Sequence, residues 1–296
     1  MILVTGATGF IGSRLLKRLS GGAQPLRGTS RRVRPEDVPA GVEAMRSDVT
    51  RPETLPSVLK GVDTVVHTAA ITANLKEPYR GAYDTINRVG TENLVAEAKR
   101  AGVSRLVLLS GLVQPPVTEG TYMATRVAME DTVRKSGISS IVLQPSVLFG
   151  DGAEFVAALD SVARWSPVLP VLGPPKLLFQ PLWVEDLLRC LEACVAGDAK
   201  LGQTLPLGGA EYVTFRQVLE TTCSAAGRRR LLLPLPMPVA RLQARLLAAV
   251  LSRPPLTPAT LELFSFDNAT QLDSVERGFG FKPRGFREHL LAHGLS

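Results

Sequence analysis

The feature that most constrains the fold is a glycine-rich segment near the start of the chain, Thr5-Gly6-Ala7-Thr8-Gly9-Phe10-Ile11-Gly12. It directly follows the apolar run Ile2–Thr5 and opens a helical stretch. Gly6 permits a tight turn, Gly9 lets the backbone approach a pyrophosphate, and Gly12 allows a helix to pack closely on a strand. The start of that helix presents N–H groups and a positive dipole end to phosphate. The segment therefore predicts a dinucleotide-binding strand–turn–helix unit.

Strand and helix signals alternate through the first half of the chain. Apolar runs at Thr64–Thr68, Leu106–Ser110 and Ile141–Leu143 predict further buried parallel strands. Helical patterns lie before or between these runs, at Gly12–Ser20, Pro52–Lys60, Thr85–Ala101 and Tyr122–Ser136. This alternation predicts the α/β class, with a doubly wound parallel sheet of the Rossmann type and helices on both faces.

The pattern changes after Gly150, where prolines interrupt a loop-rich stretch. A helix is predicted over Val184–Ala196, a short strand and turn over Thr204–Gly209, and an apolar helix near Val239–Leu251. We expect residues 1–150 to form the nucleotide-binding domain, with residues 179–209 returning to its sheet. Residues 151–178 and 210–296 are expected to form a smaller, mostly helical cap that binds the substrate.

Composition narrows the classes of partner. Lys and Arg number 34 against 27 Asp and Glu, but the basic residues are scattered and aromatic residues are only 5% of the chain. Nucleic-acid binding is therefore not expected. No apolar run reaches the roughly 18 residues of a membrane span, so membrane insertion is not expected either. The three cysteines have neither disulfide-framework nor zinc-site spacing, and no signal peptide is readable, which favours a cytoplasmic protein without a metal.

The end of the second strand indicates which dinucleotide is bound. NAD-binding folds place an Asp or Glu there to bond the ribose 2′-hydroxyl. This chain has Ser30 followed by Arg31, Arg32 and Arg34, and the first acid is Glu36. A guanidinium can bind a 2′-phosphate with two hydrogen bonds, whereas a carboxylate would repel it. The segment predicts NADP(H) as the cofactor, and the alternative is a solvated run of charge.

Other expected contacts lie where strands end and where the cap begins. Asp48-Val49 is expected to flank the adenine, and Thr68-Ala69-Ala70 to lie beside the phosphates and the nicotinamide ribose. The full set expected to bind the cofactor is Gly6, Thr8, Gly9, Phe10, Ile11, Gly12, Ser30, Arg31, Arg32, Asp48, Val49, Thr68, Ala69, Ala70, Asn87, Ser110, Tyr122, Gln144, Pro145 and Ser146. The set expected to bind the substrate is Thr72, Leu112, Gln114, Phe149, Phe155 and Trp183.

Four segments carry a resemblance to a known family: Thr5–Gly12, Gly61–Ala70, Asn87–Leu94 and Tyr122–Arg126. They resemble an extended short-chain dehydrogenase/reductase, and within it the atypical group that includes the NADP-binding accessory subunit of respiratory complex I. The resemblance covers nearly the whole chain. It implies a Rossmann domain followed by a C-terminal substrate domain, and a monomer rather than a dimer.

The resemblance also implies a catalytic set that this chain only partly matches. The family has a Ser or Thr after the fifth strand and a Tyr-x-x-x-Lys on the next helix. Here Gly111 occupies the serine position with Ser110 one residue earlier, and Arg126 replaces the lysine four residues after Tyr122. Tyr122, Arg126 and Ser110 are the candidate catalytic residues, with Tyr122 as proton donor. The alternative for Tyr122 is packing against the nicotinamide.

Several other conspicuous residues have simpler interpretations. Cys190 and Cys194 are expected in the core, and His67 is expected as a hydrogen-bonded core residue. His289 and His293 have metal-pair spacing, but no third ligand is nearby, so a solvated helix end is favoured. The basic run Arg228–Arg230 is assigned to a strand or cap edge in preference to a membrane surface.

Three functions remain open. The first is an NADPH-dependent ketoreductase acting on a bulky apolar carbonyl compound, with tailoring of an aromatic polyketide as the most specific expectation. The second is a nucleotide-sugar epimerase or dehydratase, against which the arginines at the end of the second strand argue. The third is a non-catalytic NADPH-binding sensor or assembly subunit, against which Tyr122 argues. The sequence favours the ketoreductase.

Overall fold

The computed structural model describes residues 1–114, 116–197, 201–252 and 254–295. The chain divides into two compact units. The first contains residues 1–71, 77–144 and 188–205, and the second contains residues 72–76, 145–187 and 206–296. The chain therefore leaves the first unit three times, after residues 71, 144 and 205, and returns to it twice.

The first unit is built on a seven-stranded sheet with the order β11-β6-β5-β4-β1-β2-β3. The pairs β1–β2, β1–β4, β2–β3, β4–β5 and β5–β6 are parallel. Strand order reverses between β1 and β4, which is where open α/β sheets bind nucleotides. The strands are β1 (Ile2–Thr5), β2 (Leu26–Ser30), β3 (Glu43–Arg46), β4 (Thr64–His67), β5 (Arg105–Leu109), β6 (Ser139–Pro145) and β11 (Gln203–Leu207). The predicted doubly wound fold is confirmed.

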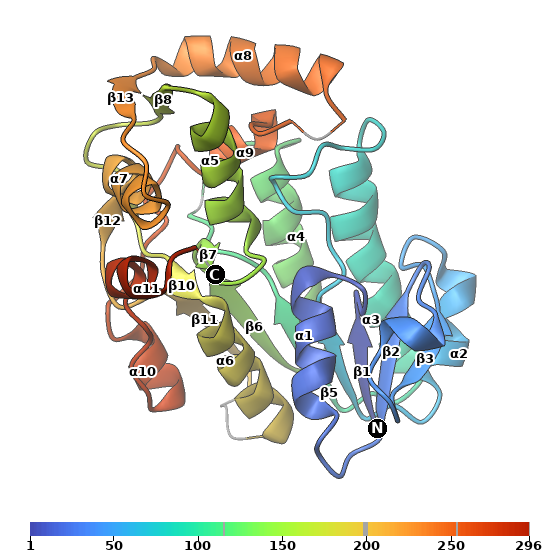
Figure 1. Cartoon of the computed structure of the whole chain (residues 1–296). Coiled ribbons are helices and arrows are strands. Elements are labelled where there is room, and N and C mark those ends of the chain that lie inside the picture. The colour runs from blue at the N-terminus through green and yellow to red at the C-terminus, as the bar shows by residue number, and fades with distance from the viewer. Residues whose placement is uncertain (115, 198–200, 253, 296) are drawn as a thin grey trace. The chain divides into compact units, whose positions relative to one another are not determined.

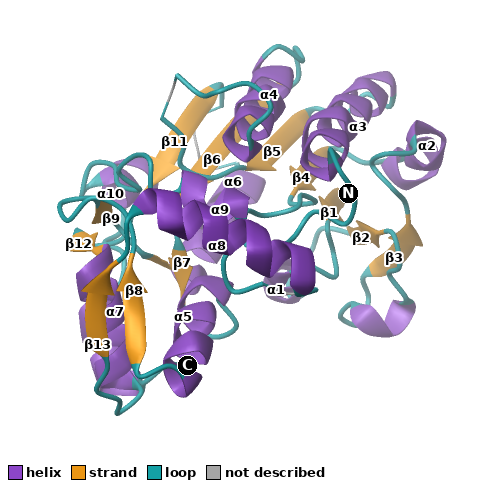
Figure 2. Cartoon of the chain, turned by 90° about the horizontal axis from the view of Figure 1, so that it is seen from above, coloured by secondary structure: helices purple, strands orange, loops and turns teal. Residues whose placement is uncertain are grey.

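Helices cover both faces of this sheet. Figure 2 shows α2, α3 and α4 on one face and α1 and α6 on the other. The helices are α1 (Phe10–Leu19), α2 (Leu55–Leu59), α3 (Gly90–Arg100), α4 (Tyr122–Arg134) and α6 (Val184–Ala196). Three shorter turns are η1 (Pro35–Asp37), η2 (Pro52–Thr54) and the π-helical η3 (Asp84–Val89). The apolar strands of the sheet and the inner helix faces together form the core of this unit.

Two boundaries differ from the predicted ones for physical reasons. Helix α1 starts at Phe10, before the predicted Gly12, because extended Gly9 is its N-cap. The helix predicted over Thr85–Ala101 is a π-helical turn followed by α3. Gly90 lies at the junction, where a Cβ atom would come within 2.6 Å of a methyl group of Val49.

The second unit is mostly helical, with three small strand pairs, β7–β10, β8–β13 and β9–β12 (Figure 1). Its strands are β7 (Leu148–Phe149), β8 (Val168–Val171), β9 (Leu178–Phe179), β10 (Leu182–Trp183), β12 (Val213–Thr214) and β13 (Leu231–Pro234). Its helices are α5 (Glu154–Trp165), α7 (Phe215–Ala225), α8 (Met237–Val250), α9 (Pro258–Glu262), α10 (Ser274–Phe279) and α11 (Phe286–His293). Its core is formed by aliphatic side chains together with the rings of Phe149, Phe179, Phe215, Phe264 and Phe286.

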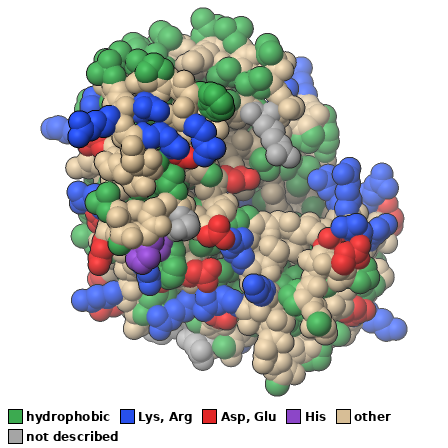
Figure 3. Space-filling model, viewed as in Figure 1, with side chains coloured by type: hydrophobic (Ala, Val, Ile, Leu, Met, Phe, Trp, Pro, Cys, Tyr) green, Lys and Arg blue, Asp and Glu red, His purple; other side chains and the backbone are tan. Residues whose placement is uncertain are grey.

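Some apolar side chains of the second unit lie outside this core. In Figure 3, hydrophobic side chains gather on the surface where Figure 1 shows α8. No helix among the described residues has both the length and the hydropathy needed to cross a membrane.

Candidate dinucleotide and reaction site

A cavity of about 380 Å³ lies at the carboxyl ends of the central strands of the first unit. It brings together eleven of the residues predicted to bind the cofactor: Gly6, Thr8, Gly9, Ser30, Arg31, Arg32, Asp48, Val49, Thr68, Ala69 and Ala70. These residues come from four segments that are far apart in the sequence. The sheet gathers them because parallel strands end at one edge.

The glycine-rich loop is fixed to the neighbouring strand end. Gly6 has a φ of +72°, and a Cβ atom there would lie 3.0 Å from the backbone nitrogen of Ala69. At Gly12 a Cβ atom would overlap the carbonyl group of Gly6. The Thr68 hydroxyl donates to the carbonyl oxygen of Thr5 at 2.6 Å, which ties the end of β4 to the loop. Glycine is therefore required at positions 6 and 12 by the local geometry.

The start of α1 has the properties of a phosphate site. Its N-cap Gly9 supplies no side-chain oxygen, and its first turn contains no acidic residue. The first intrahelical bond runs from the Ser13 N–H to the Gly9 carbonyl. The Gly9 N–H donates to the Gly6 carbonyl, but the N–H groups of Phe10, Ile11 and Gly12 have no acceptor within α1 and are left for a ligand. The helix dipole favours an anion there. The residues present fit the pyrophosphate of a dinucleotide.

The end of β2 is cationic. The Thr8 hydroxyl donates to the Ser30 hydroxyl at 3.1 Å, which joins the glycine-rich loop to this strand end. Arg31 and Arg32 follow, both exposed and lining the cavity, and neither forms an ion pair within the described residues. Arg34 differs, because its guanidinium pairs with Asp37 at 3.1 Å and holds the pKa of that carboxyl below its usual value.

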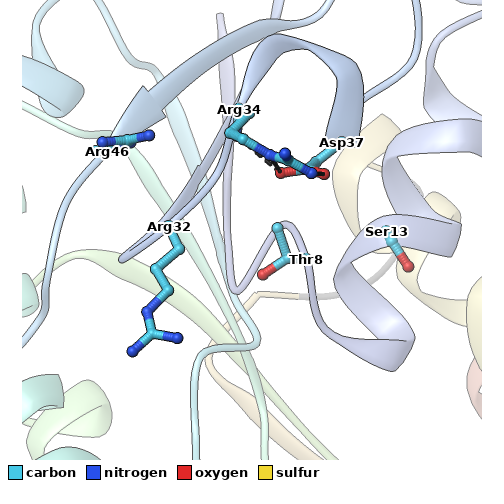
Figure 4. A pocket seen from close by; sticks show the side chains of 6 residues that line it. All are labelled: Thr8, Ser13, Arg32, Arg34, Asp37 and Arg46. Atoms are coloured by element: carbon cyan, nitrogen blue, oxygen red, sulfur yellow. Dashed lines mark hydrogen bonds and ion pairs between the residues drawn. The ribbon is translucent and has the colours of Figure 1, made fainter.

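A second cavity of about 650 Å³ adjoins this cationic end. Figure 4 shows its six lining side chains, with Arg34 turned onto Asp37 and Arg32 extending separately. Arg46 also lines it, and the sequence analysis missed this residue. The parallel register pairs Arg46 on β3 with Ser30 on β2. The sequence does show a basic residue at the end of the third strand. Its place beside Ser30 can be inferred only once the register of β2 and β3 is known.

Two predicted catalytic residues lie together on α4. The Tyr122 ring is mostly buried and meets the edge of Tyr83, with ring centres 5.2 Å apart. Arg126 is 7% exposed, and its guanidinium lies 5.7 Å from the centre of the Tyr122 ring. Its guanidinium donates to the sulfur of Met129 at 3.9 Å, and no carboxylate pairs with it among the described residues. A buried cation without a counter-charge is costly, which points to a polar ligand beside it.

The pKa of His67 is affected by the charge on Arg126. Burial, with a further contribution from Arg126, lowers the pKa of His67 to about 4. Thr91 gives its hydroxyl proton to the Asn87 carbonyl, so it can only accept from His67 Nε2, and Thr5 donates to Nδ1. His67 is a neutral, hydrogen-bonded core residue, as predicted.

The Ser110 hydroxyl is bonded to a buried carboxylate. It is 3% exposed, and its hydroxyl donates to Glu130 Oε1 at 2.6 Å. Gln144 donates to both oxygens of Glu130 at 2.9 Å, and Arg134 forms an ion pair with it. A hydroxyl has one proton, so Ser110 cannot also donate to a substrate oxygen in this arrangement. This corrects the catalytic role expected for Ser110, and Gln144 likewise belongs to the Glu130 network.

Asn87 has a structural role that the sequence did not indicate. Its side chain accepts from the Ile71 N–H at 2.8 Å and donates to the Ile71 carbonyl and the Thr125 hydroxyl. Both ends of the amide are occupied, and Asn87 is fully buried. It holds the chain after Ala70 in place, which positions one wall of the cavity without lining it.

The remaining predicted cofactor residues are differently placed. Ile11 is buried in α1, and the Phe10 ring lies under the guanidinium of Arg14. Pro145 and Ser146 belong to the second unit, where the Ser146 hydroxyl donates to the Asn268 carbonyl at 2.7 Å. Ser146 is thus occupied within that unit.

The predicted substrate residues are divided between the units. Leu112 is buried and Gln114 exposed in the first unit, and Thr72 belongs to the second. Phe149 is fully buried against Phe286, and Phe155 stacks on Phe179, so both serve the core of the second unit. Trp183 lies under the guanidinium of Arg284, 4.0 Å from the ring centre.

No group of residues with metal-ligand character occurs within the described residues. The sequence predicted a solvated helix end for His289, and this prediction is wrong. It is 7% exposed and lies beside the Trp183 and Phe149 rings. Cys190 and Cys194 are buried as predicted, and burial raises the pKa of the Cys194 thiol to about 12.

The chain is similar in sequence to two reductases and to a subunit of an NADH dehydrogenase. A ceramide reductase from Caulobacter vibrioides is 31% identical over 175 residues, 58% of this chain and 54% of that protein, so the chain matches only about half of it. A 2-alkyl-3-oxoalkanoate reductase from Stenotrophomonas maltophilia is 26% identical over 96% of this chain and 94% of that protein. The mitochondrial NADH dehydrogenase [ubiquinone] 1 alpha subcomplex subunit 9 of Arabidopsis thaliana is 22% identical over 92% and 70%.

The solved structures support the same fold. MoeE5, in complex with UDP-glucose and NAD, is 22% identical over 98% of this chain and 95% of that one, with a TM-score of 0.73. Residues 2–166 match the NAD dependent epimerase/dehydratase family. That match covers more than half of the chain and includes the glycine-rich loop, the cationic strand end and the Tyr122 helix. The protein therefore belongs to the NAD dependent epimerase/dehydratase family.

Proposed function

We propose that the protein is an NADPH-dependent ketoreductase that reduces a bulky, apolar carbonyl compound. The observation that carries the proposal is the cationic end of the dinucleotide cavity. Arg31 and Arg32 follow Ser30 without ion-pair partners among the described residues, and Arg46 adjoins them. Ser30 ends β2 at the position where an NAD-dependent fold would carry a carboxylate, and Asp48, the acid among the lining residues of the 380 Å³ cavity, follows β3 instead. A 2′-phosphate is the ligand that this chemistry favours.

The relatives support reduction of an apolar substrate over sugar chemistry. Two of them are reductases of a ceramide and of 2-alkyl-3-oxoalkanoates, compounds that combine a polar head with long alkyl chains. We take a long-chain or polycyclic carbonyl compound as the substrate class. An aromatic polyketide stays a more specific prediction within that class.

The chain's own residues divide the work between binding and proton transfer. The start of α1 binds the pyrophosphate, and Arg31, Arg32 and Arg46 bind the 2′-phosphate. Bound NADPH would supply the hydride. Tyr122 donates its phenolic proton to the carbonyl oxygen, and the Arg126 guanidinium offsets the negative charge left on the tyrosine.

The loss of Ser110 as a donor leaves one hydrogen bond to the reacting oxygen unfilled. A hydroxyl group on the substrate, next to its carbonyl, could fill that place from within the substrate. We therefore propose that reduction is assisted by a neighbouring hydroxyl on the substrate.

Turnover assays test the proposal directly. Purified protein would be incubated with NADPH and 2-alkyl-3-oxo acids of increasing chain length, with NADPH oxidation and alcohol formation followed together. We expect reduction that improves with chain length and is much slower with NADH. The competing arm offers UDP-glucose with NAD. Conversion of the sugar without reduction of any ketone would replace the reductase by an epimerase.

A further inference from the structure

Helix α8 buries small apolar side chains and exposes large ones, which is the opposite of an ordinary surface helix. The residues it buries are Ala240 and Ala244. Leu242 and Leu246 are each 60% exposed, and Val250 is 83% exposed. Val239, Leu242, Leu246 and Val250 recur at spacings of three and four, which places them along one side of a helix. Soluble proteins rarely leave such a continuous apolar face to water, and larger exposed patches mark interaction sites.

The preceding strand of the second unit also leaves leucines exposed. Strand β13 pairs with β8 and exposes Leu231 and Leu233, at 58% and 48%. The run Arg228–Arg230 directly precedes this strand, and its assignment to a strand or cap edge stays a prediction. The exposure of α8 is the observation that the sequence could not provide.

The charge around α8 is of one sign. From residue 221 to residue 261 the chain contains six arginines and no Asp, Glu or Lys. Arg228 is used within the unit, where it pairs with Asp160. Arg241 and Arg245 lie on α8 itself, are exposed, and have no ion-pair partner among the described residues. The helix thus offers aliphatic side chains and unpaired guanidinium groups together.

We infer that the outer face of α8 binds the surface of an anionic lipid bilayer. The helix has 14 residues, about 21 Å of length, which is too short to span a bilayer and suits a position in its plane. The leucines would enter the boundary of the acyl chains, while Arg241 and Arg245 meet lipid phosphates. A surface that docks in this way also brings the enzyme to substrates dissolved in the membrane. The inference itself does not depend on the proposed reaction.

Other occupants fit this face less well. A symmetric contact with a second copy would oppose Arg241 and Arg245 to the same residues, with no acid between residues 221 and 261 to pair with them. A nucleic acid would meet the arginines but would leave the leucines in water. A lipid surface satisfies both kinds of side chain.

Sedimentation with vesicles tests the inference. Full-length protein would be mixed with vesicles of phosphatidylcholine alone, or of phosphatidylcholine with phosphatidylglycerol. We expect binding to the second kind that weakens with added salt. The variant Leu242→Glu/Leu246→Glu should lose binding by about tenfold or more, because it places two charges at the acyl boundary. The variant Arg241→Gln/Arg245→Gln should lose part of the binding and most of the salt dependence.

A matched control carries the same two charges elsewhere on the second unit. Leu291 is also 60% exposed and Leu272 is 46% exposed, so Leu272→Glu/Leu291→Glu should fold and still bind vesicles. Unchanged thermal midpoints would show that all variants fold, and reduction of a short, water-soluble ketone would report the active site separately. Absence of wild-type binding to anionic vesicles, or equal loss in the control variant, would overturn the inference. Self-association that Leu242→Glu/Leu246→Glu abolishes, without vesicle binding, would assign the face to a second copy instead.

Discussion

Tyr122 and Arg126 form the proposed catalytic pair, which differs in two ways from the pattern of the family that the sequence resembles. An arginine replaces the lysine, and the nearby serine is bonded to Glu130. The tyrosine is therefore the protein's remaining proton donor in the proposed mechanism, and the substrate's own hydroxyl supplies the second hydrogen bond.

This arrangement predicts a small effect of Tyr122→Phe on a hydroxy-ketone and a large effect on its O-methylated analogue. General acid catalysis is typically worth about 10²–10⁴-fold, and the substrate's hydroxyl would recover much of that loss. Single-turnover reduction by wild type and variant measures both effects. An equally large loss on the two compounds would restore a mechanism that depends on the tyrosine alone.

His67 predicts a pH dependence of stability. Its pKa is about 4 in the folded protein and about 6.5 in an unfolded chain. Between these values the unfolded chain binds a proton that the folded chain does not, so the free energy of unfolding falls as pH drops from 6.5 toward 4. The loss is on the order of 3 kcal/mol. Urea unfolding of wild type and His67→Gln at pH 7 and pH 4.5 measures it. The same pH dependence in both proteins would contradict this account of His67.

At the scale of elements, Glu130 connects α4 to the ends of β5 and β6. It is 2% exposed and accepts from Ser110 and Gln144, while the neighbouring Asp131 makes only exposed ion pairs. Removing a buried hydrogen-bonded charge leaves its donors unsatisfied, whereas an exposed pair contributes about 0–1 kcal/mol.

We therefore expect Glu130→Ala to lower the free energy of unfolding by roughly 2–4 kcal/mol. Asp131→Ala, one residue along the same helix, should lower it by less than about 1 kcal/mol. Denaturant titration of both variants decides the point. Similar losses would mean that the Glu130 network does not hold α4 to the sheet.

The elements themselves were largely predictable, because buried parallel strands are short apolar runs and glycine marks the turn before α1. The predicted helix over Val184–Ala196 coincides with α6. Helix α5 was not distinguished within a stretch read as loop-rich, because the prolines that follow it dominated the pattern. Side-chain partners were not predictable: the bond from Ser110 to Glu130, the burial of His289 and the place of Arg46 beside Ser30 all depend on three-dimensional register.

At the scale of the whole molecule, the proposed preference for NADPH over NADH depends on the cationic end of β2 in the first unit. The chain carries a formal net charge of +7, which favours an anionic ligand in general. Selectivity for the 2′-phosphate needs local contacts as well. Arg31 and Arg32 line the cavity and have no ion-pair partners among the described residues, whereas Arg34 pairs with Asp37. We therefore expect Arg31 and Arg32 to contribute more than Arg34 to the binding of the 2′-phosphate.

The most direct measurement is the dissociation constant of NADPH and of NADH for wild type, Arg31→Ala/Arg32→Ala and Arg34→Ala. Each charge-assisted contact is worth about 1.5–3 kcal/mol, and about 1.4 kcal/mol corresponds to a tenfold change in affinity. Wild type should therefore bind NADPH tenfold or more tightly than NADH. The double variant should lose most of that preference, because only Arg46 remains for the 2′-phosphate, while its NADH affinity stays nearly unchanged. Arg34→Ala should keep the preference. Equal affinities of wild type for the two cofactors would contradict the account.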